Sequence, residues 1–316
     1  MVLGIGGRGP FRPFGCPRDA ALMGHITVGV DSSAGAAAAL RWAMREAELR
    51  GWAITAVLAW DFLDQQRSTV GEPFDPSYGE PDALDALNDI VLATTGAEAA
   101  AVISRRVVCD LAVPALLGAS SGSDLLILGA RGLGGFRGLL LGSVSQQCLH
   151  HATCPVAIVR AQAHPGGTME RIVVGVDGSD NSQRALRWAL DEGRLRQAAV
   201  EVVHTWHLPY IGVYPYSFAV FDSDSFEKAA KQVLDSVVDA EDTTSLAVPV
   251  ARIVATGGAA GVIVEQAKGA DLIVVGSRGL GGFKGLLLGS VSHQVAHHAP
   301  CPVVIVPRSA DAPAGG

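Results

Sequence analysis

Two short segments of this chain combine glycine and serine at a spacing that suits phosphate binding. In the first segment, Gly129 and Gly132 are followed after nine residues by Gly142 and Ser143. Glycines let backbone N–H groups approach an anion closely, and the N-terminus of a following helix offers unpaired N–H groups and a positive dipole end. The serine hydroxyl can add a hydrogen bond or contact a metal ion that bridges phosphates. The segment therefore predicts an anion-binding loop.

The second segment repeats the first almost unchanged. The equivalent residues are Gly276, Gly279, Gly289 and Ser290. Between residues 129–159 and 276–306, 24 of the 31 aligned pairs are identical, whereas residues 61–80 and 207–222 have diverged. A segment that only connects two elements would tolerate such divergence, so we interpret the loop as ligand-binding. The alternative is a tight connection in which the GLLL leucines fill the core.

Cationic side chains accompany both loops, within an acidic chain. They are Arg131, Arg137, Arg278 and Lys284. Neither loop ends in the Gly-Lys-Ser/Thr of a P-loop, and neither has the third glycine of a Rossmann first turn. The loops are therefore neither P-loops nor Rossmann first turns.

Each copy also has an aspartate directly after an apolar run. Asp31 follows TVGV and Asp177 follows VVGV. A carboxylate at the end of a strand can accept a hydrogen bond from a ligand hydroxyl or amine. The alternative role is capping of the next helix, but Ser33 or Ser182 can provide the cap and leave the aspartates free.

The elements that must position these residues are duplicated too. Asp31 and Asp177 are 146 residues apart, and Cys154 and Cys301 are 147 apart, so the chain is a tandem pair of domains. We expect an N-terminal extension, a first domain, a Pro- and Gly-containing linker, a second domain and a tail, over residues 1–23, 24–160, 161–170, 171–308 and 309–316.

Strands alternate with helices in both halves. In the second half, strands are predicted in residues 171–177, 199–206, 248–254, 271–276 and 302–307, and helices in 181–197, 223–240, 259–268 and 290–299. This alternation favours a parallel, doubly wound sheet, in which ligands bind beyond the carboxyl ends of the strands. The apolar closing strands, CPVAIVR and CPVVIVP, should pair across a pseudo-twofold axis as an internal dimer. Further association of two chains stays open.

Composition limits the classes of function. The 316 residues are 49% hydrophobic and have a net charge of −7, which argues against binding a nucleic acid polymer. No apolar run is long enough to cross a bilayer, and no signal peptide is visible. The five cysteines form no C-x-x-C, so we expect free thiols in the cytoplasm, with Cys154 and Cys301 in buried packing.

The strand aspartate, the G-2x-G-9x-G-S loop and the closing CPV strand together resemble the universal stress protein family, over residues 25–160 and 170–308. The pattern is similar to the tandem form and to its ATP-binding branch. The resemblance implies two tandem doubly wound domains, each a five-stranded parallel sheet flanked by helices, Rossmann-like and similar to the adenine-nucleotide alpha-hydrolases. It implies a nucleotide-dependent regulator of the stress response.

The same resemblance implies roles for individual residues. Asp31 and Asp177 would contact adenosine, and the backbone of Ala59 and Thr205 would meet the adenine edge. The ribose and phosphate contacts would come from Gly129, Arg131, Gly132, Gly142, Ser143 and Val144 in the first half, and from Gly276, Arg278, Gly279, Gly289, Ser290 and Val291 in the second. The phosphates would hold Mg²⁺ or Mn²⁺, with no protein ligand assigned. One departure is Ser32 in place of Gly178, which restricts the first turn.

Other interpretations remain beside this one. His293 and His297 have a spacing compatible with a metal, but Gln146 replaces His293 in the first half, so surface or packing roles are favoured. A slow ATPase is a second function class, although no catalytic base accompanies both loops. A nucleotide-free interaction protein is a third, and the intact glycine loops argue against it.

Overall fold

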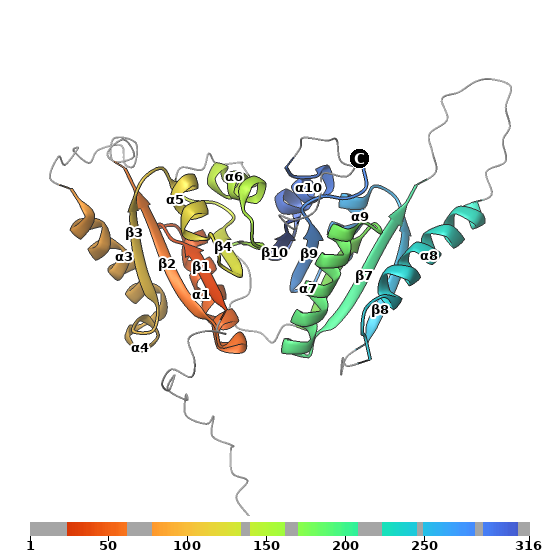
Figure 1. Cartoon of the computed structure of the whole chain (residues 1–316), viewed down its shortest axis with the longest axis horizontal. Helices are drawn as coiled ribbons and strands as arrows, with labels where there is room; N and C mark the ends of the chain where they lie inside the picture. The colour runs from red at the N-terminus through yellow and green to blue at the C-terminus, as the bar shows by residue number, and fades with distance from the viewer. Residues whose placement is uncertain are drawn as a thin grey trace, which may run out of the picture.

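A computed structural model describes residues 24–61, 78–133, 140–161, 170–207, 223–244, 249–281 and 287–308. Within these residues, ten strands form one sheet in the order β3-β2-β1-β4-β5-β10-β9-β6-β7-β8 (Figure 1). All neighbouring strands are parallel except β5 and β10, which are antiparallel. Each half of the sheet therefore has five parallel strands. In each half the strand order reverses at the first strand: β2 and β3 lie on one side of β1 and β4 and β5 on the other, and β6 is placed in the same way.

The first domain comprises β1 His25–Gly29, α1 Ala34–Arg50, β2 Ala53–Trp60, α3 Glu80–Thr95, α4 Ala97–Ala100, β3 Ser104–Cys109, α5 Ala112–Ala119, β4 Leu125–Gly129, α6 Ser143–His151 and β5 Val156–Val159. The second comprises β6 Arg171–Val176, α7 Asp180–Arg196, β7 Ala199–Trp206, α8 Ser223–Asp239, β8 Val250–Thr256, α9 Ala259–Gln266, β9 Leu272–Gly276, α10 Ser290–His298 and β10 Val303–Val306.

Burial explains why the central strands are continuous apolar runs. Every residue of β5, β9 and β10 is buried, whereas the outer strands β3 and β8 have no buried residue. Strands that helices cover on both faces lose the alternation of apolar and polar residues. Helices α1, α3, α7 and α8 pack on one face of the sheet, and α5, α6, α9 and α10 pack on the other. The predicted doubly wound architecture is confirmed.

The predicted bounds of β8 and α9 differ from the structure by two residues, and several other predicted bounds differ by one. Strand β8 begins at Val250, after Pro249, and continues to Thr256, two residues beyond the predicted end. Proline has no backbone N–H to donate to a neighbouring strand, which favours a start after it. Helix α9 ends at Gln266 rather than at residue 268.

The two domains meet through their closing strands, as the sequence predicts. Val304 of β10 lies opposite Ala157 of β5 in the antiparallel register. Arg160, just after β5, donates from Nη2 to the carbonyls of Ala296 (2.8 Å) and His297 (2.9 Å) at the end of α10. These contacts join the last elements of the two domains into one continuous core.

A second contact between the domains joins α1 to α7. Glu46 and Glu192 occupy equivalent positions in these helices, and both are 0% exposed. Arg50 donates to Glu46 at 3.1 Å and also to Glu192, while Arg196 donates to both carboxylates. We call these four residues the ionic ring. It closes because each arginine contacts its own domain's glutamate and that of the other domain.

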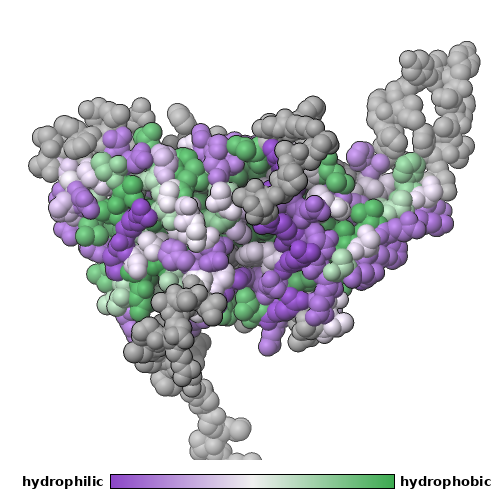
Figure 2. Space-filling model, in the orientation of Figure 1, coloured by the Kyte–Doolittle hydropathy of each residue, from purple (hydrophilic) through white to green (hydrophobic). Residues whose placement is uncertain are grey.

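Among the described residues, the outer surface of the two domains has no large apolar area on the face seen in Figure 2. Figure 2 shows hydrophobic and hydrophilic residues interspersed over one face of the two domains. No helix in the described part of the chain is long and apolar enough to span a bilayer.

Candidate functional site

Backbone hydrogen bonds close each glycine loop at its neck. Gly142 N donates to Ala130 O at 2.8 Å, and in the second domain Gly289 N donates to Ser277 O at 2.7 Å. The end of β4 or β9 is thereby held against the start of α6 or α10. Each loop thus leaves and re-enters the domain beside the switch between β1 and β4, or between β6 and β9.

Two serines that the sequence reasoning missed stabilise the same neck. Ser145 Oγ donates to Gly129 O at 2.7 Å, and Ser292 Oγ donates to Gly276 O at 2.6 Å. Both serines are buried. Their signal was the second serine of the SVS sequence, which occurs in both copies.

The first glycine of each loop is required by packing. A Cβ atom on Gly129 would lie 2.5 Å from Gly35 C, and one on Gly276 would lie 2.6 Å from Asn181 Nδ2. The first turn of α1 or α7 therefore leaves no space for a side chain here. Packing alone therefore explains these two glycines, and their predicted ligand role stays a prediction.

The strand aspartates contact the loops directly. Asp31 Oδ2 accepts a hydrogen bond from Leu133 N at 3.2 Å, and a Cβ on Gly132 would lie 2.5 Å from the same oxygen. In the second domain, Asp177 Oδ2 accepts from Leu280 N at 2.7 Å, and a Cβ on Gly279 would overlap this oxygen. Aspartate and glycine loop therefore contact each other in both domains.

The aspartates also shape the turn before the next helix. Asp177 Oδ1 accepts from Ser179 N at 3.0 Å and from Ser179 Oγ at 2.6 Å. Burial alone would raise the pKa of Asp177, but the hydrogen bonds from Ser179 and Leu280 outweigh it, and the pKa is lowered. The carboxylate is thus held in its charged form.

The predicted helix caps are half right. Ser33 caps α1 by accepting from Ala36 N. The cap of α7 is Ser179, and the prediction of Ser182 is wrong: Ser182 N donates to Ser179 Oγ at 3.2 Å. Ser179 is the residue equivalent to Ser33, so the two copies use the same cap.

The helices after the loops begin without a side-chain cap. Gly142 precedes α6 and Gly289 precedes α10, and neither position supplies a hydrogen bond from a side chain. Ser143 and Ser290 are exposed or partly exposed. A Cβ on Gly142 would find its nearest neighbour at 3.5 Å, an ordinary contact. The protein's own packing therefore does not require glycine at position 142.

The remaining predicted residues surround this point. Strand β2 continues past its last pairing with β1, so Ala59 pairs only with β3, and Thr205 of β7 likewise pairs only with β8. Val144 and Val291 are partly buried, Arg131 is exposed, and Arg278 is partly exposed. Arg137 and Lys284 lie outside the described residues.

A hollow of about 470 Å³ lies beside the second loop. It is lined by residues 258–262 at the start of α9 and by Ser290, Val291 and Gln294 of α10. Two helix N-termini therefore border the same space, and their dipoles give it positive character.

The histidines lie where α6 and α10 approach each other across the domains. Gln146 Nε2 is 3.3 Å from His293 Nε2, and the rings of His293 and His297 have centroids 4.4 Å apart. Burial lowers the pKa of His297, and His293 lowers it further. Among the described residues, no group of three His, Cys, Asp or Glu side chains is placed to hold a metal ion.

The fold and these loops define a class of protein: a tandem pair of Rossmann-like domains whose closing strands pair. A solved structure of a universal stress protein from Archaeoglobus fulgidus DSM 4304 shares this fold, with a TM-score of 0.62 and 22% identity over 90% of this chain and 98% of that chain. The model of the universal stress protein family matches residues 23–160 and 168–307. The chain therefore belongs to the universal stress protein family.

Relatives of the same tandem form occur in mycobacteria. The universal stress protein Rv2623 of Mycobacterium tuberculosis is 34% identical over 293 residues, covering 90% of this chain and 96% of the relative. A universal stress protein of Mycolicibacterium smegmatis is 32% identical over 290 residues, covering 89% of this chain and 96% of the relative.

Proposed function

We propose that this chain binds ATP or another adenine nucleotide, one molecule in each domain, and acts as a nucleotide-dependent regulator of a stress response in the cytoplasm. The observation that carries the proposal is the start of α6 and α10. At each start, a glycine that provides no side-chain cap is followed by an exposed serine, and no other described residue caps the first N–H groups. Packing does not require a glycine at Gly142, whereas a Cβ on Gly289 would lie 3.3 Å from Ser277 O, a tight contact. The glycine at Gly142 therefore favours the close approach of a ligand.

The rest of each site supports a nucleotide rather than a bare anion. Asp31 and Asp177 are placed between the strand end and the loop, where a carboxylate can accept from a ribose or base. Ala59 lies on β2 beyond its last pairing with β1, where its backbone would meet the adenine edge. Mg²⁺ or Mn²⁺ would be held by the phosphates, and Ser143 or Ser290 would be the nearest protein hydroxyl.

The test is calorimetric titration of nucleotide-free protein with ATP and Mg²⁺. We expect the unmodified chain to bind, and the double variant Gly142→Asp/Gly289→Asp to lose binding. Aspartate is a good N-cap, so it would occupy the free N–H groups, repel phosphate and leave the helices folded. Gly281→Asp is the matched control for the single variant Gly289→Asp, because it adds one carboxylate to the same loop where a Cβ meets nothing within 4 Å. Absence of ATP binding by the unmodified chain would refute the proposal.

A further inference from the structure

The two domains differ at one buried position under the glycine loop. Asn181 at the start of α7 is 7% exposed, and its Nδ2 donates to Arg278 O at 3.0 Å. The equivalent residue in the first domain is Gly35. There the corresponding carbonyl, Arg131 O, accepts from Ser33 Oγ at 3.4 Å. The base of the second loop is therefore held to its helix by a shorter, partly buried hydrogen bond.

The first domain has no space for the same contact. A Cβ on Gly35 would overlap Arg131 O, so α1 and its loop lie too close for an asparagine. A second polar residue accompanies Asn181: Nδ2 is 3.4 Å from Ser277 Oγ, whereas Ala130 stands at the equivalent place. The first helix therefore packs on the base of its loop in two different ways. The first domain uses Gly35 with Ala130, and the second uses Asn181 with Ser277.

The aspartate contacts differ in the same direction. Asp177 accepts from Leu280 N at 2.7 Å, while Asp31 accepts from Leu133 N at 3.2 Å. Gly178, next to Asp177, has a φ of +87°, a conformation that Ser32 does not adopt in the first domain. Ser32 therefore restricts the first turn to another conformation, as the sequence predicts. The second loop is held by shorter hydrogen bonds than the first at two points, Arg278 O and Leu280 N.

The entrance to the second site is also less obstructed. Gly257 and Gly258 precede α9 beside the hollow next to Ser290. In the first domain the equivalent residues are Asp110 and Leu111, and Leu111 is 57% exposed. A carboxylate at this edge repels phosphate, and a leucine occupies space that the glycines leave open.

We infer that the two nucleotide sites are not equivalent: the second binds nucleotide more tightly, and Asn181 is the positioning residue that fixes its loop. This rests on the nucleotide binding proposed above. A loop already fixed in its bound conformation loses less entropy on binding. One net hydrogen bond corresponds to about a 3- to 10-fold difference in affinity. Asn181 acts through the carbonyl of Arg278.

The experiment isolates each site in the full-length chain. Gly142→Asp leaves the second site, and Gly289→Asp leaves the first; ATP with Mg²⁺ is titrated into each by calorimetry. We expect the Gly142→Asp protein to bind at least about tenfold more tightly than the Gly289→Asp protein, from the hydrogen bond at the loop base together with the absence of the repelling carboxylate. Equal affinities would overturn the inference and leave the proposed function standing. If the unmodified chain binds no ATP, both fail.

The role of Asn181 is tested in the same two backgrounds. Asn181→Asp keeps the shape but removes the donor to Arg278 O, and Asn181→Gly copies the first domain. Both should weaken the second site about 3- to 10-fold or more. Neither should change the first site in the Gly289→Asp background, which also shows that the protein is folded. Unchanged affinity at the second site, or an equal loss at both sites, would refute the role.

Discussion

We predict that Glu46→Gln, which removes a buried charge from the ionic ring between the domains, stabilises the protein at high pH. Burial and the nearby Glu192 raise the pKa of Glu46 from its ordinary value of 4.5 to about 7, against the attraction of Arg196 and Arg50. The folded protein therefore holds a proton between these pH values that the unfolded chain releases. The contribution of Glu46 to the free energy of unfolding therefore falls as the pH rises from 4.5 to 7.

The size of the effect follows from the raised pKa. A tenfold change in the proton-binding equilibrium corresponds to about 1.4 kcal/mol. Relative to low pH, the raised pKa of Glu46 therefore lowers the free energy of unfolding by about 3 kcal/mol at pH 8 and by under about 1 kcal/mol at pH 5. Glutamine resembles the protonated acid, and both arginines keep Glu192 as a partner. We expect Glu46→Gln to stabilise the chain by up to about 3 kcal/mol at pH 8, with little change at pH 5.

Urea unfolding at several pH values would measure this difference. Trp52 and Trp188 are suitable reporters, because the Arg50 guanidinium lies 4.7 Å and 5.4 Å from their ring centroids. Glu48→Gln, at an exposed position of the same helix, is the control and should have no such pH dependence. A loss of several kcal/mol in Glu46→Gln at pH 8 would show instead that the ring needs both ionised carboxylates, and would refute the reasoning.

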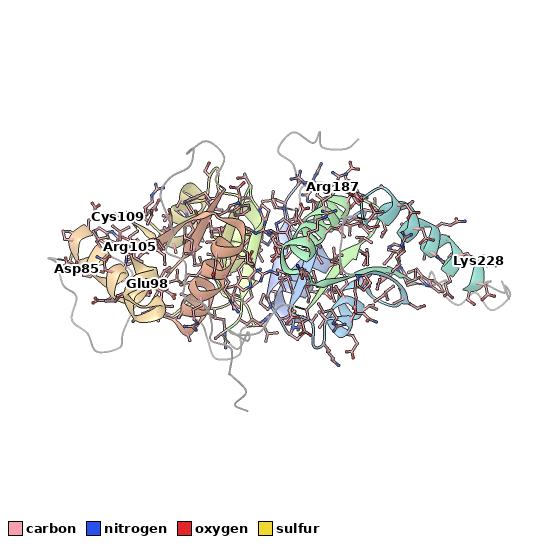
Figure 3. The ribbon with its side chains drawn as sticks, turned by 90° about the horizontal axis from the view of Figure 1, so that it is seen from below. Asp85, Glu98, Arg105, Cys109, Arg187 and Lys228 are labelled. Atoms are coloured by element: carbon pink, nitrogen blue, oxygen red, sulfur yellow. The ribbon has the colours of Figure 1, made fainter. Side chains whose placement is uncertain are left out.

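Two further predictions concern the thiols and the contact between the closing elements. Burial raises the pKa of three cysteines to about 11 or 12, whereas Cys109 is exposed on β3 at the outer edge of the first domain (Figure 3). In a Cys16→Ser variant at pH 8, a disulfide reagent should therefore modify one thiol in the folded protein and four after denaturation; rapid reaction of more than one would contradict the burial. Arg160→Leu should lower the free energy of unfolding by about 1–3 kcal/mol, because it leaves the carbonyls at the end of α10 without their donor. Urea unfolding beside Arg106→Leu, on the outer strand β3, checks this, and equal effects would contradict it.

Much of the architecture could be predicted because the chain contains its own comparison. The recurrence of Asp31 as Asp177, with glycine loops at almost the same distance, indicated the duplication. The hydrogen bonds from Leu133 and Leu280 to these aspartates were visible only in the structure. The apolar closing strands predicted the pairing that β5 and β10 make. What could not be read from the pattern was why each glycine is there. Gly129 faces the backbone of α1, whereas Gly142 faces no close neighbour, and only the packing of the helix distinguishes them.

The ionic ring could not be predicted from the sequence either, because its burial depends on how the two domains meet. Glu46 with Arg50, and Glu192 with Arg196, are each four residues apart on a helix, a pattern that is ordinarily a solvated surface pair of little consequence. Burial comes only from the second copy: near a pseudo-twofold axis, each pair meets its own equivalent. Two arginines and two carboxylates then close a ring that neither domain could form alone. Duplication therefore doubles the candidate nucleotide sites and also turns an ordinary surface pattern into the contact between the domains.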